Sequence, residues 1–436
     1  MGKKWGLCAI LILALIGCDH GKDLPLISRY IAKNVCGAIW QEGYSESAAI
    51  DYVSNIAPPL KNSWTIMVAD QASVSVRNNW FAWLNTETAM PIVSEEVSVC
   101  RNDYAGVSRQ ASTHNDSPQK ITSYVKAEFV DVTNQHSEIQ NYLKQVIAVG
   151  APEYTTAILV LHRNQVVGEV YRDGIGAASA LKGFSMSKSF ANLLVGRLAD
   201  QQRLNVNEPM LLADWSTDER GAISWDDSLR MSSGLLWHEA AIGADNDQGQ
   251  MLYNNPAPSV YARTRPLAVQ PGSEFNYSSG DYMNIATGLV QTQDWFDPGW
   301  YLGETFALEY GPTGQIPLLA EGVYLTTRGW AAMASLYMHG GVLAGQRVLS
   351  AEWVDYSLRP SATNFDYGAG IWLNRGQSLF PGLPADTFAF IGSYDRYTVA
   401  LPQHDVVVVR FGFSAQPGDF DMQDFILNIL DRLPPE

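Results

Sequence analysis

Histidine, cysteine and positive charge are scarce in this chain of 436 residues. The formal net charge is −16, which argues against nucleic acid as a direct partner. The seven histidines are scattered without metal-ligand spacing, and no cysteine pair matches a zinc or iron site. We therefore expect neither a metal nor any other cofactor. A Gly-x-Ser-x-Gly elbow is also absent, which excludes the usual α/β-hydrolase signature.

Long apolar runs are missing as well. The run from Leu7 to Ile16 is too short for a comfortable membrane span, and two lysines precede it, as in an export signal. The tetrapeptide Leu15-Ile16-Gly17-Cys18 resembles a bacterial lipobox, which implies cleavage before Cys18 and acylation of its thiol. An ordinary signal peptide with an incidental cysteine is the alternative. We expect residues 1–17 to be a signal peptide.

The residue after the lipobox cysteine bears on the compartment. Asp19 resembles the signal that keeps lipoproteins in the inner membrane of Gram-negative bacteria. The globular part would then face the periplasm, attached to the lipid bilayer of the cell membrane through an N-terminal lipid anchor.

Only two of the four cysteines are left once the signal and the lipidation site are set aside. Cys36 and Cys100 are a candidate disulfide in an oxidising compartment, with two unpaired buried thiols as the alternative. Closing a loop of this length stabilises a protein by roughly 4 kcal/mol in the chain-entropy description.

The length and the 46% hydrophobic content suit one large domain and a smaller one. We expect residues 18–120 to form a small α/β domain followed by a linker. Its β-rich runs are Trp64–Val68 and Ala72–Arg77, and the polar stretch between about 102 and 117 is typical of a linker. Residues 121–436 would form the large domain.

The large domain shows helical and strand patterns at both of its ends. A helical stripe covers 139–147, and Thr155–His162 with Val166–Tyr171 predict a hairpin. Val406–Phe413 reads as a buried strand, and a second helical stripe follows from Met422. These patterns predict an α+β fold, an antiparallel sheet flanked by N- and C-terminal helices. A mainly helical insertion, about 200–325, would form the other wall of a cleft.

The chemistry-bearing feature is Ser185 with Lys188. An i, i+3 spacing places both side chains on one helical face, and a helix N-terminus favours negative charge on the serine oxygen. Three other tetrads share this spacing, namely Ser117/Lys120, Ser123/Lys126 and Ser179/Lys182. Only Ser185 opens an apolar helical pattern. We predict a nucleophile and its base here, with a solvated helix turn as the alternative.

Four motifs occur in order around this pair. They are Gly183-Phe-Ser-Met-Ser-Lys-Ser189, Met231-Ser-Ser-Gly234, Pro271-Gly-Ser-Glu-Phe-Asn-Tyr-Ser-Ser-Gly280 and Glu321-Gly-Val-Tyr-Leu-Thr-Thr-Arg328. Together they resemble the serine β-lactamase-like hydrolases of the class C type, in particular the branch near the aminohexanoate-oligomer hydrolases and related esterases. The resemblance runs from about residue 130 to the C-terminus.

The resemblance assigns roles to individual residues. It makes Ser185 the acylated nucleophile and Lys188 the amine that takes its proton. Tyr277 would share the base role and protonate the leaving group, and a core tyrosine with a satisfied hydroxyl is its alternative. Ser279 stands where many relatives have asparagine, and we expect it to orient a substrate carbonyl.

A further element of this family is usually Lys-Thr-Gly, or a histidine-containing counterpart, on the strand that lines the site. This chain departs from that pattern. Lys188 is the last lysine of the chain, so a downstream Lys-Thr-Gly cannot occur, and the equivalent stretch is Gly392-Ser-Tyr-Asp-Arg396. We expect Ser393, Tyr394 and Arg396 to contact substrate. The Arg396 guanidinium would either engage a substrate carboxylate or pair with Asp395. In the first case the backbone N–H of Arg396, together with that of Ser185, would form the oxyanion hole.

The sequence thus predicts a membrane-tethered periplasmic serine hydrolase that cleaves a small-molecule amide or ester through an acyl-enzyme. β-Lactamase action itself is less favoured, because the Lys-Thr-Gly element is altered. The alternative is a catalytically silent relative that binds a cell-wall fragment or a protein partner in the same cleft.

Overall fold

The computed structural model describes residues 23–56, 64–69, 73–79, 86–93, 98–102, 119–120, 129–150, 154–239, 246–292, 295–296, 305–312, 314–414 and 416–434. The expected signal peptide, Cys18, Asp19 and the expected linker lie outside these residues. No helix within the described ranges is both long enough and apolar enough to cross a bilayer.

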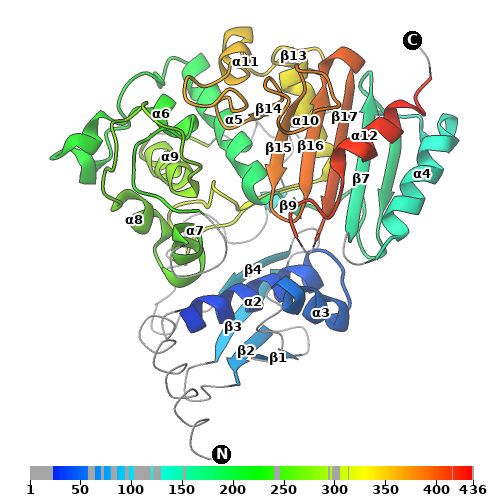
Figure 1. The fold of residues 1–436 in the computed structure, drawn as a ribbon, viewed down its shortest axis with the longest axis horizontal. Helices are drawn as coiled ribbons and strands as arrows, with labels where there is room; N and C mark the ends of the chain where they lie inside the picture. Colours follow the sequence, from blue (N-terminus) through cyan, green and yellow to red (C-terminus); the bar gives the residue numbers. More distant parts are fainter. Residues whose placement is uncertain are drawn as a thin grey trace, which may run out of the picture.

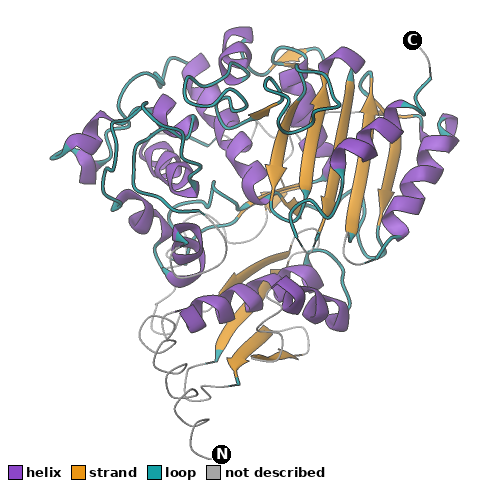
Figure 2. Cartoon of the chain, viewed as in Figure 1, coloured by secondary structure: helices purple, strands orange, loops and turns teal. Residues whose placement is uncertain are grey.

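A seven-stranded sheet forms the centre of the large domain (Figures 1 and 2). Its spatial order is β14 (Trp372–Leu373), β15 (Phe388–Gly392), β16 (Arg396–Leu401), β17 (Val406–Gly412), β7 (Thr155–His162), β8 (Gln165–Tyr171) and β6 (Val130–Asp131). Neighbouring strands are antiparallel except for β6 and β8. The predicted hairpin joins β7 to β8 through Arg163 and Asn164, which both have positive φ, as a tight hairpin turn requires.

Helices cover both faces of this sheet. On one face α4 (Ser137–Ala148) and α12 (Met422–Leu430) bury their apolar stripes against β7, β8 and β17. On the other face lie α5 (Ser187–Asp200) and α10 (Thr327–Met338), which contribute to the larger core. The two stripes predicted at the ends of the domain thus pack on the same face, and the predicted α+β fold is confirmed.

The middle of the chain is helical only in its first part. It contains α6 (Trp225–Leu229), α7 (Asp247–Gly249), α8 (Pro258–Arg263) and α9 (Ser279–Gln291), separated by loops and short 3-10 turns. Its end instead supplies β10 (Thr305–Leu308) and β11 (Val323–Leu325) to a small second sheet, whose order is β5 (Gln119–Lys120), β10, β11, β9 (Leu181–Lys182). Because β5 pairs with β10, the large domain already includes residues before 121.

The N-terminal domain is a small antiparallel sheet covered by two helices. The strands β1 (Trp64–Ala69), β2 (Ser73–Asn78), β3 (Glu87–Val93) and β4 (Ser98–Asn102) follow in spatial order, and α2 (Asp23–Trp40) packs across β2, β3 and β4 beside α3 (Glu46–Ile56). Cys36 and Cys100 form the predicted disulfide, with 5.9 Å between their Cα atoms. The disulfide ties α2 to β4.

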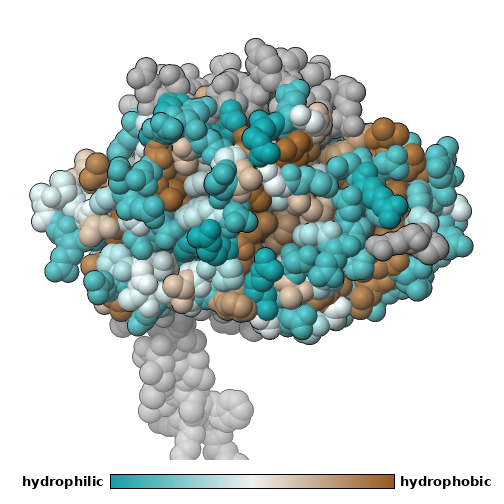
Figure 3. All heavy atoms as spheres, turned by 90° about the horizontal axis from the view of Figure 1, so that it is seen from above, coloured by the Kyte–Doolittle hydropathy of each residue, from teal (hydrophilic) through white to brown (hydrophobic). Residues whose placement is uncertain are grey.

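Each domain contributes an apolar side chain to the core of the other. Leu26 of α2 belongs to the core of the large domain, and Phe413, just after β17, belongs to the core of the small one. Tyr30 and Tyr253 meet edge to face across the interface, 5.3 Å apart. On the face seen in Figure 3 hydrophilic and hydrophobic residues are interspersed.

Candidate active site

Ser185 lies in a 3-10 turn, Phe184–Met186, between β9 and α5. From residue 180 to residue 196 it is the one position that is not buried. The surrounding apolar residues, which predicted a helix, therefore bury the segment and leave its serine accessible.

The turn before the serine is tightly constrained. Phe184 has a φ of +47°, which is unfavourable for a bulky side chain. Two cations lie close to the centre of its ring, the Lys182 amine at 4.8 Å and the Arg396 guanidinium at 4.7 Å. At Gly183 a Cβ would lie 2.3 Å from the Trp330 ring, so only glycine fits there. The position of Ser185 is thus set by its neighbours on both sides.

Lys188 contacts the serine directly. Its Nζ donates to Ser185 Oγ at 2.9 Å, to Ser279 Oγ at 3.1 Å and to the Ala320 carbonyl oxygen at 3.0 Å. The side chain is 1% exposed and makes no ion pair with any described residue. A buried amine held by neutral oxygens and in contact with a serine hydroxyl is the arrangement that proton exchange between the two requires.

The one other tetrad that lies within the described residues, Ser179/Lys182, does not form such a pair. Ser179 Oγ accepts a hydrogen bond from the Gly176 N–H, whereas Lys182 is bonded to Glu309 and Glu321. Ser117 and Ser123 lie outside the described residues.

Tyr277 lies over the base. The centre of its ring is 5.1 Å from the Lys188 amine, and the ring stacks on Trp372 at 5.7 Å. The residue is partly exposed, and within the described part of the chain its hydroxyl has no hydrogen-bond partner. The alternative of a core tyrosine with a satisfied hydroxyl does not describe it, and in this arrangement the hydroxyl is hydrogen-bonded to neither Ser185 nor Lys188.

Ser279 is placed differently from expectation. It is 0% exposed, and its hydroxyl donates to Glu239 Oε1 at 2.8 Å while accepting from Lys188 and from Gln248 at 3.1 Å each. These three bonds use the whole capacity of a hydroxyl group. Ser279 therefore positions Lys188, and the expectation that it orients a substrate carbonyl is not met in this arrangement.

The carboxylate of Glu239 anchors this side of the site. It also accepts from the Ser279 N–H at 2.6 Å and from the Trp237 indole at 2.8 Å. Sequence reasoning missed Glu239 and Gln248, because neither stands at a diagnostic spacing from Ser185. The only available signal was that Glu239 closely follows the motif Met231-Ser-Ser-Gly234.

A second carboxylate, two residues beyond Ser279, is fully buried without a cation. Burial raises the pKa of Asp281 to about 8, although a hydrogen bond from Ser233 Oγ, at 2.6 Å, opposes that rise. Among the described residues no group of three His, Cys, Asp or Glu side chains could hold a metal ion.

The structure differs most from expectation in the stretch Gly392–Arg396, which replaces the family's Lys-Thr-Gly. Arg396 is 1% exposed and pairs with Glu42 of the N-terminal domain at 2.9 Å, and it donates to the carbonyl oxygens of Lys182 and Gly412. Both expectations for its guanidinium are therefore wrong, since it engages neither a substrate carboxylate nor Asp395. Asp395 instead accepts hydrogen bonds from the backbone N–H groups of Gly418 and Phe420.

The Tyr394 side chain is also engaged by residues of the protein itself. Its ring stacks on Phe413 at 4.2 Å, and its hydroxyl bonds Tyr30 and Asn34 of α2. Ser393 is exposed in the hairpin turn between β15 and β16. The residue that approaches the serine segment is Gly392, where a Cβ would lie 2.2 Å from the Gly183 carbonyl oxygen.

Comparisons with known proteins agree with this geometry. Residues 153–297, which include Ser185, Lys188 and Tyr277, match the β-lactamase family. This segment of the chain is similar to the serine β-lactamase-like hydrolases. Among solved structures the chain is similar to a protein assigned as a 6-aminohexanoate-dimer hydrolase from Bacillus anthracis, with 18% identity, a TM-score of 0.56 and coverage of 67% of this chain and 83% of that one.

Two further structures share the fold. EstCE1, a hydrolase with promiscuous acyltransferase activity, has 14% identity and a TM-score of 0.51. A protein assigned as a β-lactamase from Bacteroides dorei has 17% identity and a TM-score of 0.50. Each match covers 69% of this hydrolase and 98% of the other chain. At these identities the likeness shows the fold, and the reacting residues come from the geometry above.

Proposed function

We propose that this protein hydrolyses a small ester or amide through an acyl-enzyme on Ser185, on the periplasmic face of the membrane to which it is tethered. The observation that carries the chemical part is the 2.9 Å contact between Lys188 Nζ and the accessible Ser185 Oγ. Among the residues that the structure describes Lys188 has no ion-pair partner, which supports the same role, because its proton can leave without breaking an ion pair.

Each step balances with groups of this chain. With Lys188 in its neutral form, its amine takes the Ser185 proton as Oγ attacks the substrate carbonyl carbon. The bond to the leaving group then breaks, and the leaving alcohol or amine takes a proton from Tyr277 or, through it, from Lys188. Water attacks the resulting ester, releases the acid and returns the proton to Ser185.

The substrate class follows from the site and from the related structures. One similar protein is assigned as a hydrolase of the dimer of 6-aminohexanoate, a linear amide, and another, EstCE1, is a hydrolase with promiscuous acyltransferase activity. Because Arg396 is buried in an ion pair, this chain lacks the expected guanidinium for a substrate carboxylate. We therefore favour uncharged acyl groups.

A fluorophosphonate probe followed by intact-mass measurement tests the nucleophile. We expect one adduct on the wild-type protein and none on Ser185→Ala, together with turnover of p-nitrophenyl esters that the variant lacks. An adduct that persists in Ser185→Ala would remove the assignment. Binding of a cell-wall fragment without turnover of any ester or amide would favour the silent relative.

The tether is a separate part of the proposal and rests on Leu15-Ile16-Gly17-Cys18 and Asp19. Mass spectrometry of the N-terminal peptide from the membrane fraction should find a diacylglyceryl group on Cys18. Cys18→Ala should release the protein from the membrane without changing the turnover of Ser185. An unmodified Cys18 in a membrane-free protein would contradict it.

A further inference from the structure

Ion pairs between described residues cross the interface between the domains at two places. Lys33 of α2 lies 2.6 Å from Glu309 and 3.2 Å from Glu321. Glu42, just after α2, pairs with Arg396 at 2.9 Å. All five side chains are buried. Removing charges from water costs free energy, and a buried ion pair often gains no more than this cost. Holding the two domains together is therefore not a sufficient reason for these contacts.

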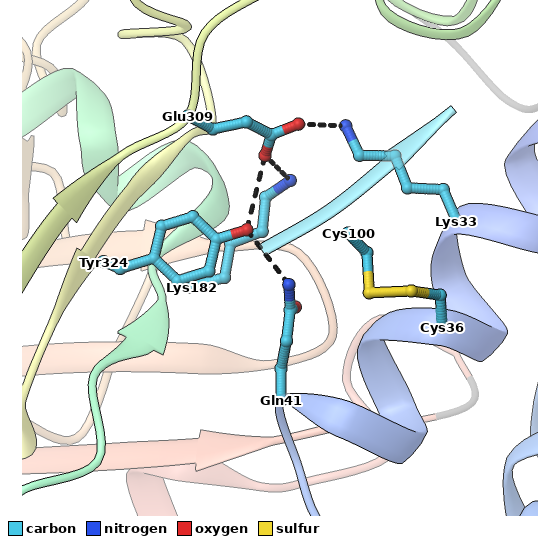
Figure 4. The surroundings of a disulfide bond; sticks show 7 residues. All are labelled: Lys33, Cys36, Gln41, Cys100, Lys182, Glu309 and Tyr324. Carbon is cyan, nitrogen blue, oxygen red and sulfur yellow. Dashed lines mark hydrogen bonds and ion pairs between the residues drawn. A yellow bond between two sulfur atoms is a disulfide. The ribbon is translucent and has the colours of Figure 1, made fainter. Parts of the chain in front are cut away.

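Lys182 completes the first group (Figure 4). Its amine is 2.9 Å from Glu309 and 3.0 Å from Glu321, so that two lysines balance two glutamates. Burial alone would raise the pKa of both carboxyls, but Lys182 and Lys33 hold it below the ordinary value. Without Lys33, one negative charge in this buried group would lose its counter-charge.

The group is joined to the base by a single peptide link. Glu321 follows Ala320, whose carbonyl oxygen accepts the hydrogen bond from Lys188 at 3.0 Å. A shift of Glu321 toward or away from Lys33 would therefore move an oxygen that holds the catalytic amine.

The group is also joined to the nucleophile. Lys182 stands three residues before Ser185, and its carbonyl oxygen accepts a hydrogen bond from Arg396 at 2.6 Å. Arg396 and Lys182 both contact the ring of Phe184, the residue with positive φ. A strained backbone of this kind persists only where surrounding contacts enforce it, and Glu42 supplies the counter-charge for one of them.

We propose that Lys33 and Glu42 are positioning residues, through which the N-terminal domain holds Ser185 and Lys188 in their reactive geometry. The disulfide at Cys36, one helical turn after Lys33, ties α2 to its own sheet, so Lys33 on the helix and Glu42 in the turn after it both come from an element that is covalently held to the N-terminal domain. The catalytic consequence rests on the proposed hydrolase function, whereas the mechanical coupling does not.

Hydrogen exchange measured by mass spectrometry tests the coupling without any substrate. We compare Lys33→Met and Glu42→Gln with Glu87→Gln, whose carboxylate is also buried but pairs with Arg29 inside the N-terminal domain at 2.8 Å. Residues 181–190 should exchange about ten-fold faster in the first two variants and at the wild-type rate in the third. Equal exchange in all three would overturn the proposal.

Steady-state kinetics test the catalytic consequence. We expect kcat for a p-nitrophenyl ester to fall about 10-fold or more in Lys33→Met, with KM within about two-fold, and to stay unchanged in Glu87→Gln. Lys33→Arg keeps the charge and should retain most of the activity. Wild-type kcat in both Lys33→Met and Glu42→Gln would contradict a positioning role.

A double variant that keeps the buried charges balanced tests the proposal if Lys33→Met does not fold. Lys33→Met/Glu309→Gln removes one charge of each sign, and we expect it to fold and to recover at least half of the lost kcat. A folded double variant that is as slow as, or slower than, Lys33→Met would argue against charge balance as the cause. If the wild-type protein shows neither turnover nor labelling of Ser185, the proposed function fails, and the exchange rates alone decide the coupling.

Discussion

Lys182 and Lys188 are six residues apart and both buried, but their surroundings are opposite. Lys182 is bonded to two carboxylates, Glu309 and Glu321. Lys188 is bonded to two hydroxyl groups and one carbonyl oxygen. The difference separates a lysine within a balanced ionic group from the amine that we propose as the base, which makes no ion pair with any described residue.

The strongest test of this comparison is to remove the amine of Lys188. We expect Lys188→Met to lower kcat about 10³-fold, because Ser185 loses its proton acceptor, while the melting temperature changes little. Ester turnover and thermal unfolding measure the two effects. A variant with more than about a tenth of the wild-type kcat would exclude Lys188 as the base.

The matching change at Lys182 should act on stability. Lys182→Met leaves two buried carboxylates with Lys33 alone, and we expect the free energy of unfolding to fall by about 3–5 kcal/mol. Urea unfolding measures it, with Lys144→Met on the exposed face of α4 as the control. Unchanged stability in Lys182→Met would show that the cluster is not essential to the fold.

A smaller effect is expected from the residue that holds the base in place. Ser279→Ala removes one acceptor of the Lys188 amine and one donor to Glu239, and should lower kcat about 10-fold with little change in KM. A rise in KM at constant kcat would instead restore Ser279 as a substrate-binding residue.

The smallest expected effect concerns two buried carboxylates, Glu309 and Asp281, whose pKa values are shifted in opposite directions. The pKa of Glu309 is lowered by its lysines, so its stabilisation is present above its unfolded pKa and is lost in acid. The pKa of Asp281 is raised to about 8, so its cost appears as the pH rises from about 4 toward 8. Asp281→Asn should stabilise the protein by about 1 kcal/mol or more at pH 8 and not at pH 4, as thermal unfolding at both values will show. Stabilisation that is the same at both values would contradict the raised pKa.

Much of the large domain could be predicted because its signals are local. The helical stripe near Ile139 and the strand from Val406 were read from periodicity, since a buried face imposes its period on the sequence. The strands in the later part of the predicted helical insertion could not be read from periodicity, because β10 and β11 are short and belong to a sheet that also contains the distant strands β5 and β9. Nothing near them in the chain indicates those partners.

The sequence by itself determined the pair Ser185 and Lys188, because the geometry of one helical turn brings side chains three residues apart together. Only the tertiary structure showed which partners the charged residues of the domain interface have. There Arg396, predicted to meet substrate, pairs with Glu42, 354 positions earlier in the chain, and Lys33 meets Glu309 and Glu321. Such contacts depend on how the two domains dock, and a linear pattern of charges carries no information on which buried partner each one finds.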